Sequence, residues 1–287
     1  MIASPVLFAY PRRIRGDTFA VPHSLTHMTA ALIISLRESF ETALIVCVML
    51  AFLRRTETAR YDRFIWAGLA AGAAFSLALS VALNLSIRTM PLEWRSITEG
   101  VVMIAAAILV GWMTVWMAGK SRSMKMEVEQ EMSAHIQTGR ALGIFLMSFL
   151  STAREGAEMV IMVQAAMLSG VKLLHAISGV ATGITGAAIL GWVFFRGMRR
   201  ISLRHFFAAT GIVLLLLGTG LSVRGIGLLA GTPVAAEAHV EEEGLGEEIM
   251  EVLLGTSEMP SPLQMAGALL YLSLIGRAWY RASRRNA

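Results

Sequence analysis

The sequence predicts an all-α integral membrane protein with seven transmembrane helices, built as an inverted repeat of three plus three helices with one additional C-terminal helix. Composition is the first observation: 55% of the 287 residues are hydrophobic and 16% are charged. Seven apolar stretches are the second, because about 20 helical residues cross a hydrocarbon core of about 30 Å. Only helices or closed barrels satisfy their backbone in lipid, so we expect every span to be helical. A charged motif that recurs in the first and fourth stretches is the third observation.

The spans divide residues 28–280 into seven segments, and we treat this range as one transmembrane domain. Residues 1–27 form an N-terminal extension, and a start site assigned upstream of the true start at Met28 is an alternative explanation for them. Residues 232–262 form an acidic exterior loop, and residues 281–287 form a basic tail. The expected spans are residues 29–53, 64–87, 97–118, 141–169, 172–195, 205–223 and 262–280.

Basic residues orient the chain in a cell (plasma) membrane. Sixteen of the 25 Lys and Arg residues fall after the first, third and fifth spans or in the last part of the chain, from Arg277 onward. Because cytoplasmic loops are enriched in Lys and Arg, we expect these segments to be cytoplasmic. The N-terminus would then be outside and the C-terminus in the cytoplasm.

The first span contains Arg37-Glu38-Ser39-Phe40-Glu41, and the fourth contains Arg154-Glu155-Gly156-Ala157-Glu158. An Arg at i with Glu at i+1 and i+4 shares about a 100° arc of one helix face. Charged groups at membrane depth cost at least about 2.5 kcal/mol each on insertion scales, and they usually face a substrate pathway. A structural Arg–Glu pair between helices is the alternative, and a second copy in an equivalent place makes it less favoured.

The motifs predict an inverted repeat, because the first span runs inward and the fourth runs outward. Gly68 and Gly72 in the second span correspond to Gly179 and Gly183 in the fifth, with a spacing that permits close helix contact. A hydroxyl residue also precedes each arginine by two positions, Ser35 in the first motif and Thr152 in the second. In transporters of this design the substrate site lies near the midplane, at the repeat interface.

Four further residues are weaker candidates. Glu99 lies near the expected start of the third span, where helix capping and metal ligation are equally open. The exterior loop has eight glutamates and no Lys or Arg, which fits either a solvated acidic loop or a surface that collects cations. In that loop Glu248 and Glu251 lie one helical turn apart, and His239 is nearby.

Other classes of function are disfavoured. The net charge of +5 comes from loops, so it does not indicate nucleic-acid binding. The eighteen Met residues are scattered, which favours apolar packing over a copper site. No nucleotide-binding loop and no nucleophile–base set is evident, so neither direct ATP coupling nor enzymatic activity is expected.

With Arg-Glu-x-x-Glu in spans one and four, the chain resembles the oxidase-linked iron/lead transporter family, which includes fungal high-affinity iron permeases and the bacterial Efe-type iron permease. The similarity covers about residues 28–280. The family commonly has Arg-Glu-Gly-x-Glu; the second motif keeps this glycine, whereas the first has Ser39. The resemblance implies that Glu38, Glu41, Glu155 and Glu158 bind the metal, with Arg37 and Arg154 supporting them. It also implies an exterior Glu-x-x-Glu, for which Glu248 and Glu251 are the match.

We therefore expect a membrane permease that imports iron ions, with no tightly bound cofactor. Carboxylate oxygens suit hard cations, which agrees with iron. A separate exterior iron oxidase or iron-delivery protein is an expected partner. The alternatives are a permease for lead, manganese or another divalent cation, and a non-transport membrane protein such as an intramembrane enzyme or a structural partner.

Overall fold

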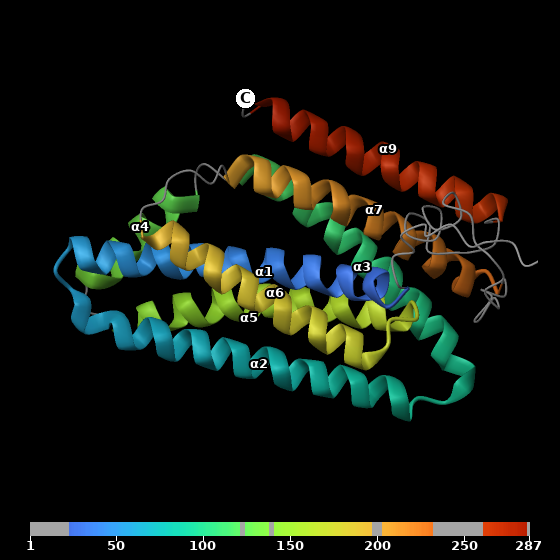
Figure 1. Ribbon diagram of the computed structural model, residues 1–287, viewed down its shortest axis with the longest axis horizontal. Coiled ribbons are helices and arrows are strands. Elements are labelled where there is room, and N and C mark those ends of the chain that lie inside the picture. The colour runs from blue at the N-terminus through green and yellow to red at the C-terminus, as the bar shows by residue number, and fades with distance from the viewer. Residues whose placement is uncertain (1–22, 121–123, 138–140, 197–202, 232–260, 286–287) are drawn as a thin grey trace, which may run out of the picture.

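The computed structural model describes residues 23–120, 124–137, 141–196, 203–231 and 261–285, and all regular structure in these ranges is helical (Figure 1). A short 3₁₀ turn, η1 (Ala59–Tyr61), precedes the second helix. The helices are α1 (His23–Arg55), α2 (Asp62–Thr89), α3 (Leu92–Lys120), α4 (Met124–Gln137), α5 (Ala141–Leu168), α6 (Leu173–Phe195), α7 (Leu203–Leu229) and α9 (Pro262–Arg285).

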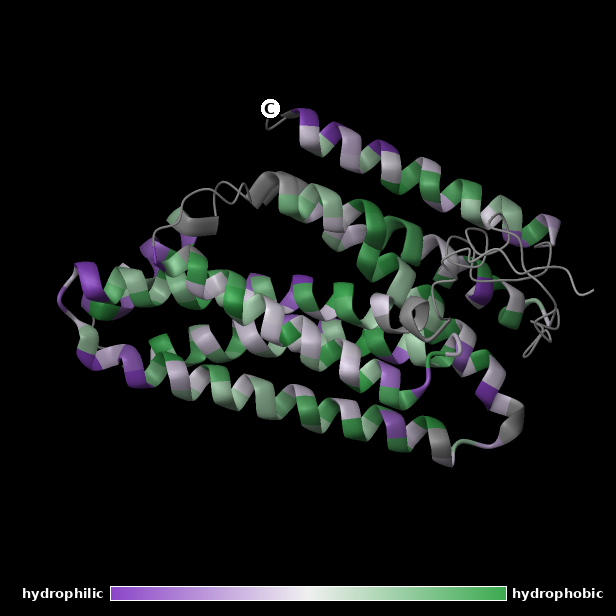
Figure 2. Ribbon diagram, viewed as in Figure 1, coloured by the Kyte–Doolittle hydropathy of each residue, from purple (hydrophilic) through white to green (hydrophobic). Residues whose placement is uncertain are grey.

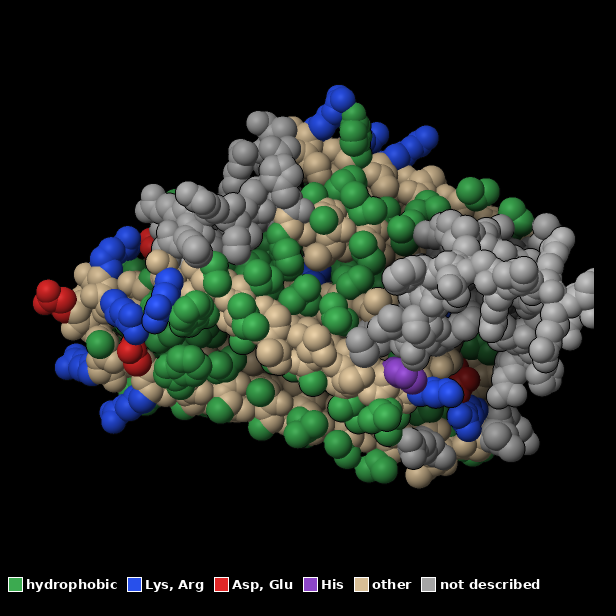
Figure 3. Space-filling view, in the orientation of Figure 1, with side chains coloured by type: hydrophobic (Ala, Val, Ile, Leu, Met, Phe, Trp, Pro, Cys, Tyr) green, Lys and Arg blue, Asp and Glu red, His purple; other side chains and the backbone are tan. Residues whose placement is uncertain are grey.

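Within the described residues, length and composition identify four segments that could cross a membrane. They are Ala59–Ile87, Trp94–Met117, Leu173–Val193 and Phe206–Leu229. Helices α1 and α5 are just as long, but each has three charged residues near its centre. Large apolar side chains such as Leu77, Trp112 and Leu174 are exposed along the helices, as expected for surfaces that face lipid (Figures 2 and 3). The chain is therefore an all-helical protein embedded in a membrane.

The long helices pack in three pairs, α1 with α6, α2 with α5, and α3 with α7, while α1 also lies against α5. At the α1–α6 crossing, a Cβ added to Gly183 would collide with the hydroxyl of Ser35. At the α2–α5 crossing, a Cβ on Gly72 would lie 2.7 Å from the Cβ of Thr152. Glycine at these two positions therefore permits the close approach of the helices that carry the charged motifs.

Helix α9 packs on α3 and α7 and lies on the outside of the bundle (Figure 1). Two hydrogen bonds attach it. The hydroxyl of Tyr271 donates to the carbonyl of Ala107 on α3 at 2.9 Å, and Nε2 of Gln264 donates to the carbonyl of Val223 on α7 at 3.2 Å. Both polar side chains thus find partners within an otherwise apolar surface.

Helix α4 was not expected from the sequence. It has 14 residues, which span about 21 Å at 1.5 Å per residue, so it is too short to cross a bilayer. Val128 and Met132 are buried in a core that includes Val46 and Met49 of α1. An ion pair between Arg55 and Glu129 at 3.3 Å adds a second attachment to α1.

One end of the bundle gathers the segments rich in basic residues. Helix α1 ends and α2 begins there, next to α4, and α6, α7 and α9 also have their basic ends toward this side (Figure 1). Lys and Arg side chains appear at this margin, at the top and at the lower right in Figure 3, whereas hydrophobic side chains cover the middle. We refer to this end as the α4 side.

Candidate cation-binding site

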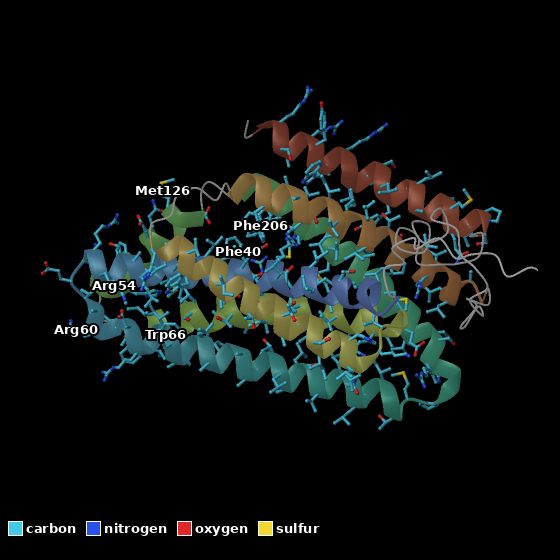
Figure 4. The ribbon with its side chains drawn as sticks, in the orientation of Figure 1. Phe40, Arg54, Arg60, Trp66, Met126 and Phe206 are labelled. Atoms are coloured by element: carbon cyan, nitrogen blue, oxygen red, sulfur yellow. The ribbon has the colours of Figure 1, made fainter. Side chains whose placement is uncertain are left out.

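The charged motif of α1 lies entirely inside the protein. Arg37, Glu38 and Glu41 are each only 1% exposed. Nη1 of Arg37 donates to Oε1 of Glu38 at 3.3 Å, and Nε of Arg37 lies 3.4 Å from Oε1 of Glu41 without the alignment of a hydrogen bond. Between the glutamates, Phe40 packs edge-to-face on Phe206 of α7, with ring centroids 4.7 Å apart, which fixes the rotation of α1 (Figure 4).

The charged motif of α5 is arranged differently. Nε of Arg154 donates to Oε1 of Glu158 at 2.9 Å, and the guanidinium lies over the ring of Trp116 from α3, with Cζ 4.8 Å from its centroid. The Arg154 side chain is 47% exposed, in contrast to the buried Arg37. Glu155 is 4% exposed and Glu158 is 13% exposed, so the two carboxylates turn inward while the arginine does not.

Three of the four motif glutamates meet between α1 and α5. One carboxylate oxygen each from Glu38, Glu155 and Glu158 lies within 4.8 Å of the other two. Two oxygens on opposite sides of one cation are about 4–5 Å apart for bonds of about 2.0–2.5 Å, so the cluster has the dimensions of a metal site. Without a cation or a proton among them, three carboxylates this close repel one another.

Each of the four glutamates also has an oxygen that is buried and accepts no hydrogen bond from the described part of the chain. These oxygens are Oε2 of Glu38, Oε1 of Glu41, Oε2 of Glu155 and Oε2 of Glu158. Buried polar atoms in folded proteins nearly always have a partner, and an unsatisfied one indicates an absent ion, an absent water or a functional role. The four oxygens are suited to a hard cation.

A cavity of about 310 Å³ adjoins this cluster. It lies among α1, α3, α4 and α5, and its polar lining is Glu41, Glu127, Glu131, Ser151, Arg154 and Glu155. Glu127 and Glu131 on α4 are exposed, so the cavity reaches the surface on the α4 side. A hydrated ion could therefore approach Glu41 and Glu155 from that side.

Glu99 lies apart from the cluster. Its Oε1 accepts a hydrogen bond from Nε of Arg95, one turn earlier on α3, at 2.8 Å. Helix α3 begins at Leu92, five residues before the expected start of this span. Capping acts within the first turn, and Glu99 lies beyond that turn, so it does not cap the helix. Glu248, Glu251 and His239 lie outside the described residues.

Sequence reasoning missed the glutamates of α4 and the role of Trp116. A signal for α4 was present, since Val128, Met132 and Ile136 recur at intervals of four and give the segment one apolar face. Glu127 and Glu131 share that interval and occupy the neighbouring face. Nothing in the local sequence around Trp116 indicates that it packs against Arg154.

Comparison with known proteins identifies the family. The profile of the iron permease FTR1 family matches residues 28–251, which include both charged motifs and α4. The chain belongs to the iron permease FTR1 family. The chain is similar to the ferrous iron permease EfeU of Escherichia coli O157:H7, with 30% identity over 256 residues, 85% of this chain and 92% of the relative. It is also similar to ferrous iron permease EfeU of Yersinia pestis, with 26% identity over 245 residues, 85% of this chain and 83% of the relative.

No solved structure matches this FTR1 family member. Membership in a family of permeases makes the chain a transporter and not an enzyme. Family membership also agrees with the apolar helices and with the iron permease expected from the Arg-Glu-x-x-Glu motifs.

Proposed function

We propose that the chain is an iron permease that passes Fe²⁺ through a carboxylate site formed by Glu38, Glu41, Glu155 and Glu158. The observation that carries the proposal is the buried oxygen without a hydrogen-bond partner on each of these glutamates. The names of the relatives support iron as the ion, and those names specify ferrous iron.

Charge supports binding of a cation at this site. Four motif carboxylates face two motif guanidinium groups, so the fully ionised set has a formal charge of −2 and attracts a divalent cation. Arg37 contacts Glu38 and Glu41, and Arg154 contacts Glu158, which lowers the cost of burying the carboxylates. Entry of Fe²⁺ would replace the arginines as the partner of the carboxylates.

We further propose that α1–α3 and α5–α7 are inverted repeats and that α9 is the seventh span. A twofold axis would exchange the α1–α6 pair with the α2–α5 pair and would map both the α3–α7 pair and the α1–α5 contact onto themselves. The observed pairs have this pattern. The glycine contacts have it as well, because Gly183 meets Ser35 and Gly72 meets Thr152, and each hydroxyl residue precedes a motif arginine by two positions.

The same geometry supports a proposal for the orientation in the plasma membrane. The four basic segments that the sequence assigns to the cytoplasm all belong to helix ends on the α4 side (Figure 1). We therefore propose that the α4 side is cytoplasmic, with the C-terminus inside and the N-terminus outside. The cavity would then open toward the cytoplasm, and the proposed direction is import.

Anaerobic uptake of ⁵⁵Fe²⁺ into proteoliposomes tests the function. The wild-type chain should accumulate iron, and the competing ions Mn²⁺ and Pb²⁺ should inhibit less than excess unlabelled Fe²⁺. Glu41→Gln and Glu158→Gln each remove one charge at nearly constant size, and uptake should almost cease in both. Full uptake by either variant would overturn the site, and stronger competition by Mn²⁺ or Pb²⁺ than by Fe²⁺ would overturn iron as the substrate.

Two controls sharpen this experiment. Glu99→Gln also removes one intramembrane carboxylate, but it should leave uptake unchanged because Glu99 pairs with Arg95 away from the cluster. Anaerobic uptake by the purified chain alone also tests whether transport requires the exterior oxidase or iron-delivery protein expected as a partner. Uptake under these conditions would show that the partner is not required for passage of Fe²⁺ itself.

A further inference from the structure

The cavity beside the motif glutamates has carboxylates at both of its ends. Glu41 and Glu155 line it from α1 and α5 and are 1% and 4% exposed, whereas Glu127 and Glu131 line it from α4 and are exposed. Oε1 of Glu41 and Oε2 of Glu155 are buried and accept no hydrogen bond from the described residues. Oε1 of Glu41 faces Nε of Arg37 at 3.4 Å, so the acceptor oxygen at the inner end without a hydrogen bond or an ion pair among the described residues is Oε2 of Glu155.

Helix α4 is placed so that two of its glutamates reach this cavity. Val128 and Met132 anchor one face in the core, and Arg55 holds Glu129 on another. Glu127 and Glu131 are four residues apart, so they lie one above the other on the remaining face, which lines the cavity. The three glutamates of α4 therefore have different environments. Of these three, Glu127 and Glu131 line the same cavity as the motif residues Glu41 and Glu155.

We propose that Glu127 and Glu131 form a second carboxylate site, at the mouth of the cavity, which receives the divalent cation when the motif glutamates release it on the α4 side. This inference rests on the proposed function, and it adds an exit site that the motifs do not contain. Its ligands are oxygens, so it takes the same hard or borderline cations as the motif site. Its exposure makes it a weaker and faster-exchanging site than the buried cluster.

Electrostatics explains why an exit needs such a site. Arg154 also lines the cavity, so its guanidinium repels a cation that leaves the motif through this cavity. Clefts lined by one sign of charge raise the local concentration of the opposite ion by about 10- to 1,000-fold. Two carboxylates beyond Arg154 offset its repulsion and draw the ion along the cavity.

Flux measurements from both sides of oriented proteoliposomes test the proposal. The double variant Glu127→Gln with Glu131→Gln should raise the KM for Fe²⁺ presented on the α4 side about tenfold, the lower end of the range for charged clefts. The KM for Fe²⁺ presented on the opposite side should not change. The difference should shrink at 1 M salt, where the Debye length is about 3 Å.

Glu129→Gln is the control, because it removes one carboxylate from the same helix outside the cavity. Both KM values should remain at the wild-type level in this variant. If Glu127 and Glu131 only balance the charge of Arg154, the double variant will lose thermal stability without a change of KM on either side. That result, or an equal change of KM on both sides, overturns the exit site.

Equilibrium binding separates this inference from the transport function. Tb³⁺ binds oxygen ligands, and its luminescence is excited through a nearby tryptophan, here Trp116. With the motif site disabled by Glu38→Gln and Glu158→Gln, purified protein should keep a Tb³⁺ signal that Trp116→Phe removes. Adding Glu127→Gln and Glu131→Gln should weaken Tb³⁺ affinity at least about tenfold, whereas adding Glu129→Gln should not. An unchanged affinity overturns the exit site even if iron transport is confirmed, and absent wild-type transport overturns the proposed function alone.

Discussion

The hydroxyl of Ser76 on α2 occupies the space that a side chain at Gly156 of α5 would need. Gly156 is the central glycine of the second charged motif, and Ser76 donates to the carbonyl of Gly72 at 2.9 Å. The contact therefore joins the motif to the glycine that permits the α2–α5 crossing. It explains in steric terms why one motif has glycine at its third position.

Substitutions at Gly156 and Ser76 give the first prediction. Gly156→Ser should destabilise the protein by about 1–3 kcal/mol, as overpacking does. Adding Ser76→Ala should restore most of that loss, because it removes the atom in the way. Thermal melting in detergent measures both effects. Gly276→Ser on α9 is the control, since no atom lies within 4 Å of a Cβ added there, and an equal loss in that variant would contradict the steric explanation.

The two motif arginines should differ in their contribution to stability. Arg37 is 1% exposed and contacts two carboxylates, so Arg37→Met leaves buried charges unpaired and should cost about 3–5 kcal/mol. Arg154 is 47% exposed, so Arg154→Met should cost about 1 kcal/mol or less. Equal destabilisation in thermal melts would show that the two halves do not differ as described.

A combined substitution separates an ion site from a structural ion pair. Arg37→Met together with Glu41→Gln removes the guanidinium and one of its two carboxylate partners, so part of the stability lost in Arg37→Met should return. Iron uptake should remain abolished, because Glu41 is a proposed ligand. Uptake by this double variant, measured in proteoliposomes, would show that Glu41 only neutralises Arg37.

Weakening the attachment of helix α9 should lower stability without changing iron transport. Tyr271→Phe removes the hydrogen bond to Ala107 and should cost about 0.6 kcal/mol, the average for such bonds between membrane helices, and at most about 1.7 kcal/mol. The KM for iron should not change, because this bond lies between α9 and α3 and not in the cluster. Tyr280→Phe on the exposed face of α9 is the control. A shift of KM in Tyr271→Phe would instead couple α9 to the site.

The acidic segment of residues 232–262 gives a prediction from the sequence. Glu248→Gln with Glu251→Gln should raise the KM for iron presented outside about tenfold and leave the maximal rate unchanged, as expected for a surface that collects cations. Loss of uptake at every iron concentration would place these residues on the obligatory path.

The motifs could be recognised from sequence because three charges interrupt an apolar run in both α1 and α5. The sequence could not show that Arg37 is buried while Arg154 is half exposed, because the two motifs are nearly identical and exposure depends on the helices that surround each of them. The spacing of the glycines in α2 and α6 indicated close helix crossings. It did not indicate that the α2 glycines contact α5 or that Gly183 of α6 contacts α1. Helix α4 was missed because its 14 residues are mostly polar and follow a basic segment, which is typical of a loop.

The position of α4 in the chain has a consequence for the thermodynamics of passage. It follows the third long helix and contains Glu127, Glu129 and Glu131, and the segment that follows the sixth long helix, α7, is also rich in glutamate. If the halves are related by inversion, one acidic segment borders each face of the bilayer. An ion would then exchange its water shell for carboxylate oxygens in stages on both faces, so that no single step bears the full cost of dehydration.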